Sequence, residues 1–180
     1  MTQAAPHARS RLGRSTVVAL VTMTVVLLGA CGSGSGNGSS NVTHIGITGA
    51  DGKPTSLADL KGTPLVVNMW ATWCSPCVNE MPALDQVASS STGVTVIGVN
   101  VGDTATAAAT FATKLGVHYA QYTDPDGKLS TALKVTGLPA TAFVAADGTV
   151  LEVHQGAYTA DTLRAAIQQH FPGPDGGTTP

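Results

Sequence analysis

The chain has 180 residues, of which 43% are hydrophobic and 11% are charged, so it has enough apolar surface for a single hydrophobic core. The formal net charge is −2, and beyond residue 14 six Lys and Arg stand against all eleven Asp and Glu, which leaves −5. This balance argues against nucleic acid as a partner, and an anionic lipid surface would repel it.

The first 30 residues are typical of an export signal. Three arginines in the first 14 residues precede an uncharged run, 15–30, which is shorter than the ~20 apolar residues of a membrane-spanning helix. The run ends in Leu28-Gly29-Ala30-Cys31, which resembles the bacterial lipobox, whose cysteine becomes the lipid-bearing first residue. We therefore expect a lipoprotein signal peptide at 1–30 and lipidation at Cys31. An ordinary secretory peptide or an uncleaved anchor are the alternatives, and all three interpretations place the domain outside the cytoplasm.

The segments on either side of the expected domain have few side chains to bury. Residues 31–41 are rich in Gly and Ser and predict a flexible tether. Residues 172–180 form a tail of Gly, Pro and Thr that we expect to be disordered. One domain remains at 42–171, with its membrane attachment supplied by the lipid alone.

The first half of this domain predicts a strand, a short helical turn, a buried strand and a helix. A strand at 42–48 should end in a turn at 51–53, and Ser56 can cap a helical turn through Leu60. The apolar, β-branched run 64–70 fits a strand buried on both faces. A helix follows at 78–88, and Pro82 inside it should cause a kink.

The second half predicts a further buried strand, three helices and a hairpin. In chain order these are a strand at 94–101, a helix from Asp103 or Thr104 to Leu115, a helix at 128–135, a hairpin of 141–145 with 149–154, and a helix from Thr159 or Asp161 to His170. The order βαβ, then α, then ββα predicts an α/β domain whose mixed central sheet is covered by helices on both faces.

The motif Trp73-Cys74-Ser75-Pro76-Cys77 lies between the strand at 64–70 and the helix that follows. Two cysteines three residues apart on a first helical turn share one face and can close a bond reversibly. The helix N-terminus favours a thiolate on the first of them. We therefore expect Cys74 to be the nucleophile and Cys77 the resolving thiol of a redox-active disulfide.

Two other interpretations of this cysteine pair are weaker. A purely structural disulfide would close a four-residue loop, which constrains the unfolded chain too little to be an efficient staple. A zinc site would need two more ligands, and His44, His118, His154 and His170 show no ligand pairing. No metal or prosthetic group is expected, because the dithiol is itself the redox centre.

Several motifs together resemble the thioredoxin fold, and more closely the TlpA/ResA-like branch of extracytoplasmic thiol–disulfide oxidoreductases. They are the WCSPC motif at 73–77, Glu80-Met81-Pro82, the GVNVG run at 98–102, the added helix at 103–115, and Leu138-Pro139 before a strand. The resemblance covers most of 45–171. It implies a thioredoxin fold extended by an N-terminal strand or hairpin and by an inserted helix.

The resemblance also implies roles for residues around the cysteines. Pro139 should be a cis-proline that faces the disulfide, keeps metals from the dithiol and leaves the backbone of Leu138 free to pair with an extended substrate. Trp73 should flank the site as a shield, whereas Trp70 on the strand should belong to the core. In this sequence Phe143 stands one step later than the family's aromatic residue, so strand alternation would move it to the opposite face of the sheet.

Glu80 lies three residues beyond Cys77 and can share its face of the helix. In the family a glutamate here is proposed to handle protons during exchange. A partly buried carboxylate would have a raised pKa and could take the proton of Cys77. A solvated glutamate, favoured by the helix dipole, is the alternative.

These features predict a lipid-anchored enzyme that exchanges its dithiol with cysteines of exported proteins. By resemblance the favoured substrate class is apocytochrome c, with a membrane thiol protein as electron donor. Because Ser75-Pro76 has no histidine to add positive charge, we expect a reductant. A disulfide-forming oxidant and a copper metallochaperone that uses His118 or His154 are the alternatives. A peroxiredoxin-type peroxidase is disfavoured because Ala71, not Thr or Ser, stands three residues before Cys74.

Overall fold

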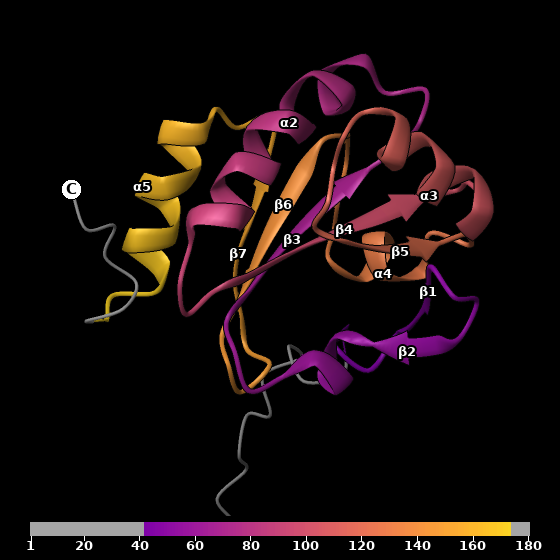
Figure 1. The fold of residues 1–180 in the computed structure, drawn as a ribbon. Helices are drawn as coiled ribbons and strands as arrows, with labels where there is room; N and C mark the ends of the chain where they lie inside the picture. The colour runs from indigo at the N-terminus through magenta and orange to yellow at the C-terminus, as the bar shows by residue number, and fades with distance from the viewer. Residues whose placement is uncertain (1–41, 174–180) are drawn as a thin grey trace, which may run out of the picture. The chain divides into compact units, whose positions relative to one another are not determined.

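The computed structural model describes residues 42–173. The expected signal peptide at 1–30, the tether at 31–41 with Cys31, and the tail beyond residue 173 lie outside this range. Within the described range a single sheet of seven strands has the order β2-β1-β5-β4-β3-β6-β7 (Figure 1). The strands are β1 (Gly46–Gly49), β2 (Pro54–Ser56), β3 (Leu65–Trp70), β4 (Thr95–Val101), β5 (Ala120–Asp124), β6 (Ala140–Val144) and β7 (Val150–Gln155).

The sheet is mixed, as predicted. Strand β4 runs parallel to both β3 and β5, whereas β6 is antiparallel to β3 and β7. On the other side, β1 is antiparallel to β5 and forms a hairpin with β2. The expected thioredoxin fold with an N-terminal hairpin is therefore present.

Helices cover both faces of the sheet. They are α2 (Ser75–Ser90), α3 (Ala105–Lys114), α4 (Lys128–Ala132) and α5 (Ala160–His170), with a short 3-10 helix, η1 (Leu57–Leu60). One core cluster joins α2, α3 and α5 to the side chains of Val66 and Trp70 on β3. The other joins η1 and α4 to Leu65, Val67 and Met69 of the same strand. Strand β3 is buried at all six positions because its side chains alternate between these two clusters.

The observed elements differ from the predicted ones at several points, and the first strand spans Gly46–Gly49 rather than 42–48. Strand β5 was not predicted; only its last two residues, Thr123 and Asp124, are fully buried, so the apolar pattern that marks a strand is missing. Helix α2 begins at Ser75, so the cysteine pair lies at its first turn, as predicted, and Pro76 stands where a missing N–H costs nothing. The helix predicted at 128–135 is shorter in the structure, where α4 ends at Ala132. The backbone of Lys134, two residues later, has a positive φ of 58° and is not helical.

Strand β5 also positions part of the core beneath the site. The indole Nε1 of Trp70 donates a hydrogen bond to Oε1 of Gln121 at 3.0 Å. A Cβ at Gly98 would collide with the side chain of Gln121, so glycine is required there for this bond to form. Trp70 is fully buried, as predicted.

Phe143 lies on the face covered by α2 and α5. Its ring lies 4.4 Å from the ring of His170 and 6.1 Å from that of Tyr158, measured between centroids. Phe143 belongs to the same core cluster as Cys74 and Cys77. The aromatic side chain therefore packs beneath the helix that carries the dithiol.

Candidate active site

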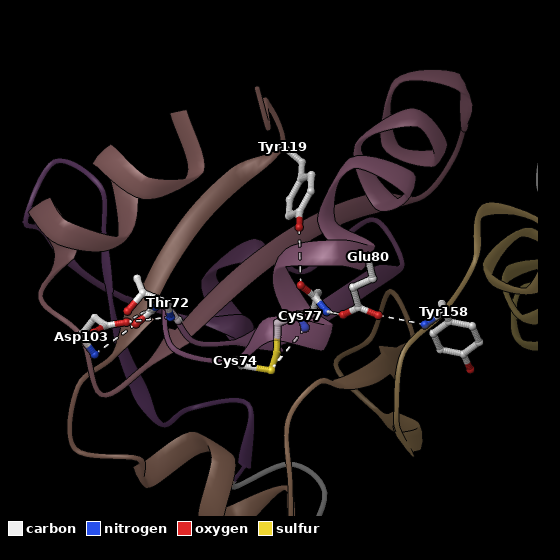
Figure 2. Close-up of a disulfide and its surroundings, with 9 residues drawn as sticks. Thr72, Cys74, Cys77, Glu80, Asp103, Tyr119 and Tyr158 are labelled. Atoms are coloured by element: carbon white, nitrogen blue, oxygen red, sulfur yellow. Dashed lines mark hydrogen bonds between the residues drawn. A yellow bond between two sulfur atoms is a disulfide. The ribbon is translucent and has the colours of Figure 1, made fainter. Parts of the chain in front are cut away.

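Cys74 and Cys77 form a disulfide at the N-terminus of α2, with 5.3 Å between their Cα atoms (Figure 2). Cys74 is the N-cap residue, and its Sγ accepts a hydrogen bond from the backbone N–H of Cys77 at 3.3 Å. An N–H in the first turn of a helix otherwise lacks an intrahelical partner. After reduction the same N–H and the helix dipole would stabilise a thiolate on Cys74.

The residues of the motif differ in exposure. Cys74 is 5% exposed and Cys77 is fully buried, whereas the neighbouring Trp73 is 72% exposed. A large apolar side chain so exposed beside a disulfide is available to contact another protein.

Glu80 is buried, with 4% of its surface exposed, and both carboxylate oxygens are held. Oε1 accepts a hydrogen bond from Nδ2 of Asn68 at 2.7 Å, and Oε2 accepts one from the backbone N–H of Tyr158 at 2.8 Å (Figure 2). The solvated alternative for Glu80 is therefore wrong. Burial raises its pKa to about 7, although the two hydrogen bonds act in the opposite direction.

Asn68 and Tyr119 extend this network into the interior. The hydroxyl of Tyr119 donates to Oδ1 of Asn68 at 3.5 Å, which turns the amide nitrogen of Asn68 toward Glu80. Burial, followed by the charge of Glu80, raises the pKa of Tyr119 well above its usual value. Neither residue was predicted from the sequence to belong to the site. The sequence does contain one sign of Asn68, which is the polar residue within the otherwise apolar run that forms β3.

The peptide bond between Leu138 and Pro139 is cis, as the resemblance implied. Pro139 is buried, and the half-buried Leu138 packs against the cluster that contains both cysteines. The carbonyl of Pro139 accepts a hydrogen bond from the N–H of Gly156 at 2.8 Å. The segment before α5 thus contacts Pro139 through Gly156 and Glu80 through Tyr158, two residues further on.

A second polar group, also missed from the sequence, fixes the loop before Cys74. Oδ2 of Asp103 accepts hydrogen bonds from the N–H of Thr72 at 3.1 Å and from Nδ2 of Asn100 at 2.9 Å (Figure 2). Burial raises the pKa of Asp103, but these hydrogen bonds outweigh it and hold the pKa below its usual value. Asp103 is therefore ionised at neutral pH and ties the start of α3 to the approach to the active site.

Three of the four histidines in the described range have separate partners. Nδ1 of His118 lies 3.0 Å from Oδ2 of Asp85, the ring of His154 stacks on that of Tyr158, and Nε2 of His170 lies 2.9 Å from Oε2 of Glu152. Among residues 42–173 no three His, Cys, Asp or Glu side chains are grouped so as to hold a metal ion. In the same part of the chain, no helix has the length and apolar character needed to span a bilayer.

The sheet order, the disulfide at the start of α2 and the cis bond before β6 define a thioredoxin-fold thiol–disulfide oxidoreductase. The family model described as Redoxin matches residues 37–167. The chain belongs to the Redoxin family.

Characterised relatives support the activity. The chain is 31% identical over 140 residues to the thiol-disulfide oxidoreductase ResA of Bacillus subtilis (strain 168), which covers 77% of this chain and 78% of the relative. It is 37% identical over 105 residues to the thiol:disulfide interchange protein DsbE of Pseudomonas fluorescens biotype C, covering 58% of each chain. The protein is thus an oxidoreductase of the ResA and DsbE type.

Solved structures support the fold. MTB DsbF, solved in mixed oxidized and reduced forms, is 35% identical, with a TM-score of 0.62 over 68% of this chain and 91% of that one. The exposed lipoprotein thioredoxin Etrx1 of Streptococcus pneumoniae is 27% identical, with a TM-score of 0.58 over 69% of this chain and 98% of that one.

Proposed function

We propose that the protein is a lipid-anchored, extracytoplasmic reductant that transfers two electrons from the Cys74–Cys77 dithiol to disulfides in exported proteins. The observation that carries this proposal is the Sγ of Cys74 at the N-cap of α2, where it accepts the N–H of Cys77. In the forward reaction the Cys74 thiolate attacks a substrate disulfide and forms a mixed disulfide. Cys77 then attacks Cys74, and the substrate leaves with both of its sulfurs reduced.

Trp73, Leu138 and Pro139 form the proposed substrate-binding surface. Trp73 is exposed beside the disulfide, and Leu138 packs against the core cluster that contains both cysteines. An extended peptide would pair with the backbone of Leu138, with its cysteine directed at Cys74. By resemblance to the TlpA/ResA-like branch, we propose apocytochrome c as the substrate class and a membrane thiol protein as the electron donor.

Glu80 is proposed to take the proton of Cys77 before the resolving step. A general base works best when its pKa lies near the operating pH. The pKa of about 7 that burial gives Glu80 meets this condition. Its position one turn beyond Cys77 on α2 places the two residues on related faces of the helix.

The direction of electron flow is predicted from the charges near the sulfurs. Helix α2 contains no Lys, Arg or His that would stabilise a thiolate, and the carboxylate of Glu80 disfavours one nearby. A less stabilised dithiol is a stronger reductant. Equilibration with glutathione should therefore give a potential closer to the about −270 mV of thioredoxin than to the about −120 mV of a strong oxidant. A value near the oxidant end would instead make the protein a disulfide-forming enzyme on the same fold.

Attachment to the membrane is proposed to depend on Cys31, the cysteine of the lipobox-like sequence. A similar protein, the thioredoxin Etrx1 of Streptococcus pneumoniae, is described as an exposed lipoprotein. Fractionation of cells should find the wild-type protein with the membrane and the Cys31→Ser variant released from it. Equal membrane retention of both proteins would contradict the lipid anchor.

A further inference from the structure

The hydroxyl of Thr141 on β6 is buried and has no hydrogen-bond partner among residues 42–173. Thr141 is completely inaccessible to solvent. Buried hydroxyl groups in folded proteins almost always have a protein or water partner, because leaving one without a partner has an energetic cost. Thr141 lies two residues beyond the cis-proline, and its unpaired hydroxyl requires an explanation.

The sheet register places Thr141 between two residues that contact the surroundings of Glu80. Thr141 is the cross-strand partner of Asn68 on β3 and of His154 on β7, so the three side chains share one face of the sheet. Asn68 donates to Oε1 of Glu80. His154 stacks on Tyr158, whose N–H donates to Oε2. Both neighbours of Thr141 in the sheet therefore lead to Glu80: Asn68 bonds its carboxylate directly, and His154 contacts Tyr158, which supplies the second hydrogen bond.

The face that Thr141 shares is the one that α2 covers. Val66 and Trp70 flank Asn68 on β3, and both belong to the core cluster that contains Cys77. Phe143, two residues beyond Thr141 on β6, belongs to it as well. The hydroxyl of Thr141 therefore lies on the sheet face that α2 covers, beside Asn68 and on the same side as the buried carboxylate of Glu80.

We propose that the Thr141 hydroxyl and the Glu80 carboxylate share an internal water molecule, and that Thr141 is thereby a positioning residue for proton transfer from Cys77 to Glu80. A buried water needs two to four polar partners, and Thr141, Glu80 and Oδ1 of Asn68 provide three. The water donates to the ionised carboxylate, which strengthens its ionised form. This inference rests on the proposed role of Glu80 as the base.

The other titratable groups around Glu80 belong to four elements. Cys77 lies on α2, Tyr119 directly before β5, His154 on β7, and Tyr158 in the segment before α5. Burial raises the pKa of Tyr158 to about 12, and the pKa of Tyr119 also lies above its usual value, so both hydroxyls stay neutral near pH 7. Stacking on Tyr158 orients the ring of His154. Glu80 lies one helical turn beyond Cys77 and has a pKa of about 7, so it is the group expected to accept the proton that Cys77 loses.

A kinetic experiment with 5,5′-dithiobis(2-nitrobenzoate) tests the inference. The reduced protein releases one thionitrobenzoate when Cys74 attacks the reagent and a second when Cys77 attacks the mixed disulfide, so the second phase reports the resolving step. Thr141→Val removes the hydroxyl at almost constant shape. We expect it to slow the second phase about fivefold at pH 7, which corresponds to the loss of one hydrogen bond. The midpoint of the pH profile should also move upward, because the ionised carboxylate of Glu80 loses a donor. Thr141→Ser, which keeps the hydroxyl, should restore the wild-type rate.

Glu80→Gln separates this inference from the proposed function. If Glu80→Gln slows the second phase but Thr141→Val does not, the inference is wrong and Glu80 remains the base. If Thr141→Val slows it equally in the Glu80→Gln background, Thr141 acts independently of Glu80 and the inference is also wrong. If Glu80→Gln has no effect, the proposed base is wrong. A high-resolution crystal structure should show a water within hydrogen-bond distance of Thr141 Oγ1 and Glu80, absent in Thr141→Val, and an empty site in the wild type would overturn the inference.

Discussion

Replacing Cys77 with serine is expected to convert the enzyme into a covalent trap. The thiolate of Cys74, the N-cap residue of α2, can still attack a substrate disulfide, but the buried thiol that would release the product is gone. Mixed disulfides with exported proteins should accumulate, and turnover should fall to the background level. Non-reducing electrophoresis and mass spectrometry of the trapped species would detect these adducts and identify the partner proteins.

The matched control is Cys74→Ser, which keeps Cys77 but removes the sulfur at the N-cap. It should trap no substrate, because Cys77, in the first turn of α2, is fully buried. Capture by Cys74→Ser together with none by Cys77→Ser would reverse the roles of the two cysteines. The identity of the trapped proteins would also test the proposal of apocytochrome c as substrate.

Glu80→Gln is expected to slow the resolving step about 100-fold at pH 7, the lower range of general-base catalysis. In the wild type the rate should rise with pH through about 7, as Glu80 becomes ionised. In the variant the rise should move toward about 8.5, the ordinary pKa of a cysteine. The second thionitrobenzoate phase, measured from pH 5 to 9, would show both effects. An unchanged pH profile would contradict the role of Glu80 in proton transfer.

The same carboxylate should make stability depend on pH. The pKa of Glu80 is raised from 4.5 to about 7 by burial, so the folded protein binds this proton more tightly than the unfolded chain. The contribution of Glu80 is most favourable below pH 4.5 and is lost as the pH rises through about 7. At pH 8 Glu80→Gln should therefore raise the free energy of unfolding by about 1–3 kcal/mol, allowing for one donor that glutamine leaves unpaired. Urea unfolding of the oxidised proteins should show this gain at pH 8 and lose it below pH 5.

Local patterns allowed most of the fold to be predicted from the sequence. The run at 64–70 became β3 because its apolar side chains serve both core clusters. The end of α3 follows from Gly116, whose φ of 71° is unfavourable for other residues. Strand β5 could not be predicted because its first three residues are exposed or only half-buried and its position depends mainly on pairing with β4.

Less of the active site than of the fold could be predicted from the sequence. The CxxC motif could be recognised because its two cysteines lie close together in the chain, and the cis-proline was expected from the family resemblance. The sequence left the burial of Glu80 undecided, because it depends on Asn68, twelve residues earlier, and on Tyr158, 78 residues later. Thr141 acquires its position from β3 and β7 on either side. Contacts between residues so far apart in the chain produce no recognisable pattern in a single sequence.

Alkylation of the reduced, folded protein with iodoacetamide, followed by mass spectrometry from pH 5 to 9, tests the central claim most directly. The structure predicts that Cys74 reacts as a thiolate with an apparent pKa below the ordinary ~8.5, while the fully buried Cys77 is protected. If both cysteines instead react equally slowly at neutral pH, the start of α2 does not activate Cys74. The proposed order of attack and release would then be wrong.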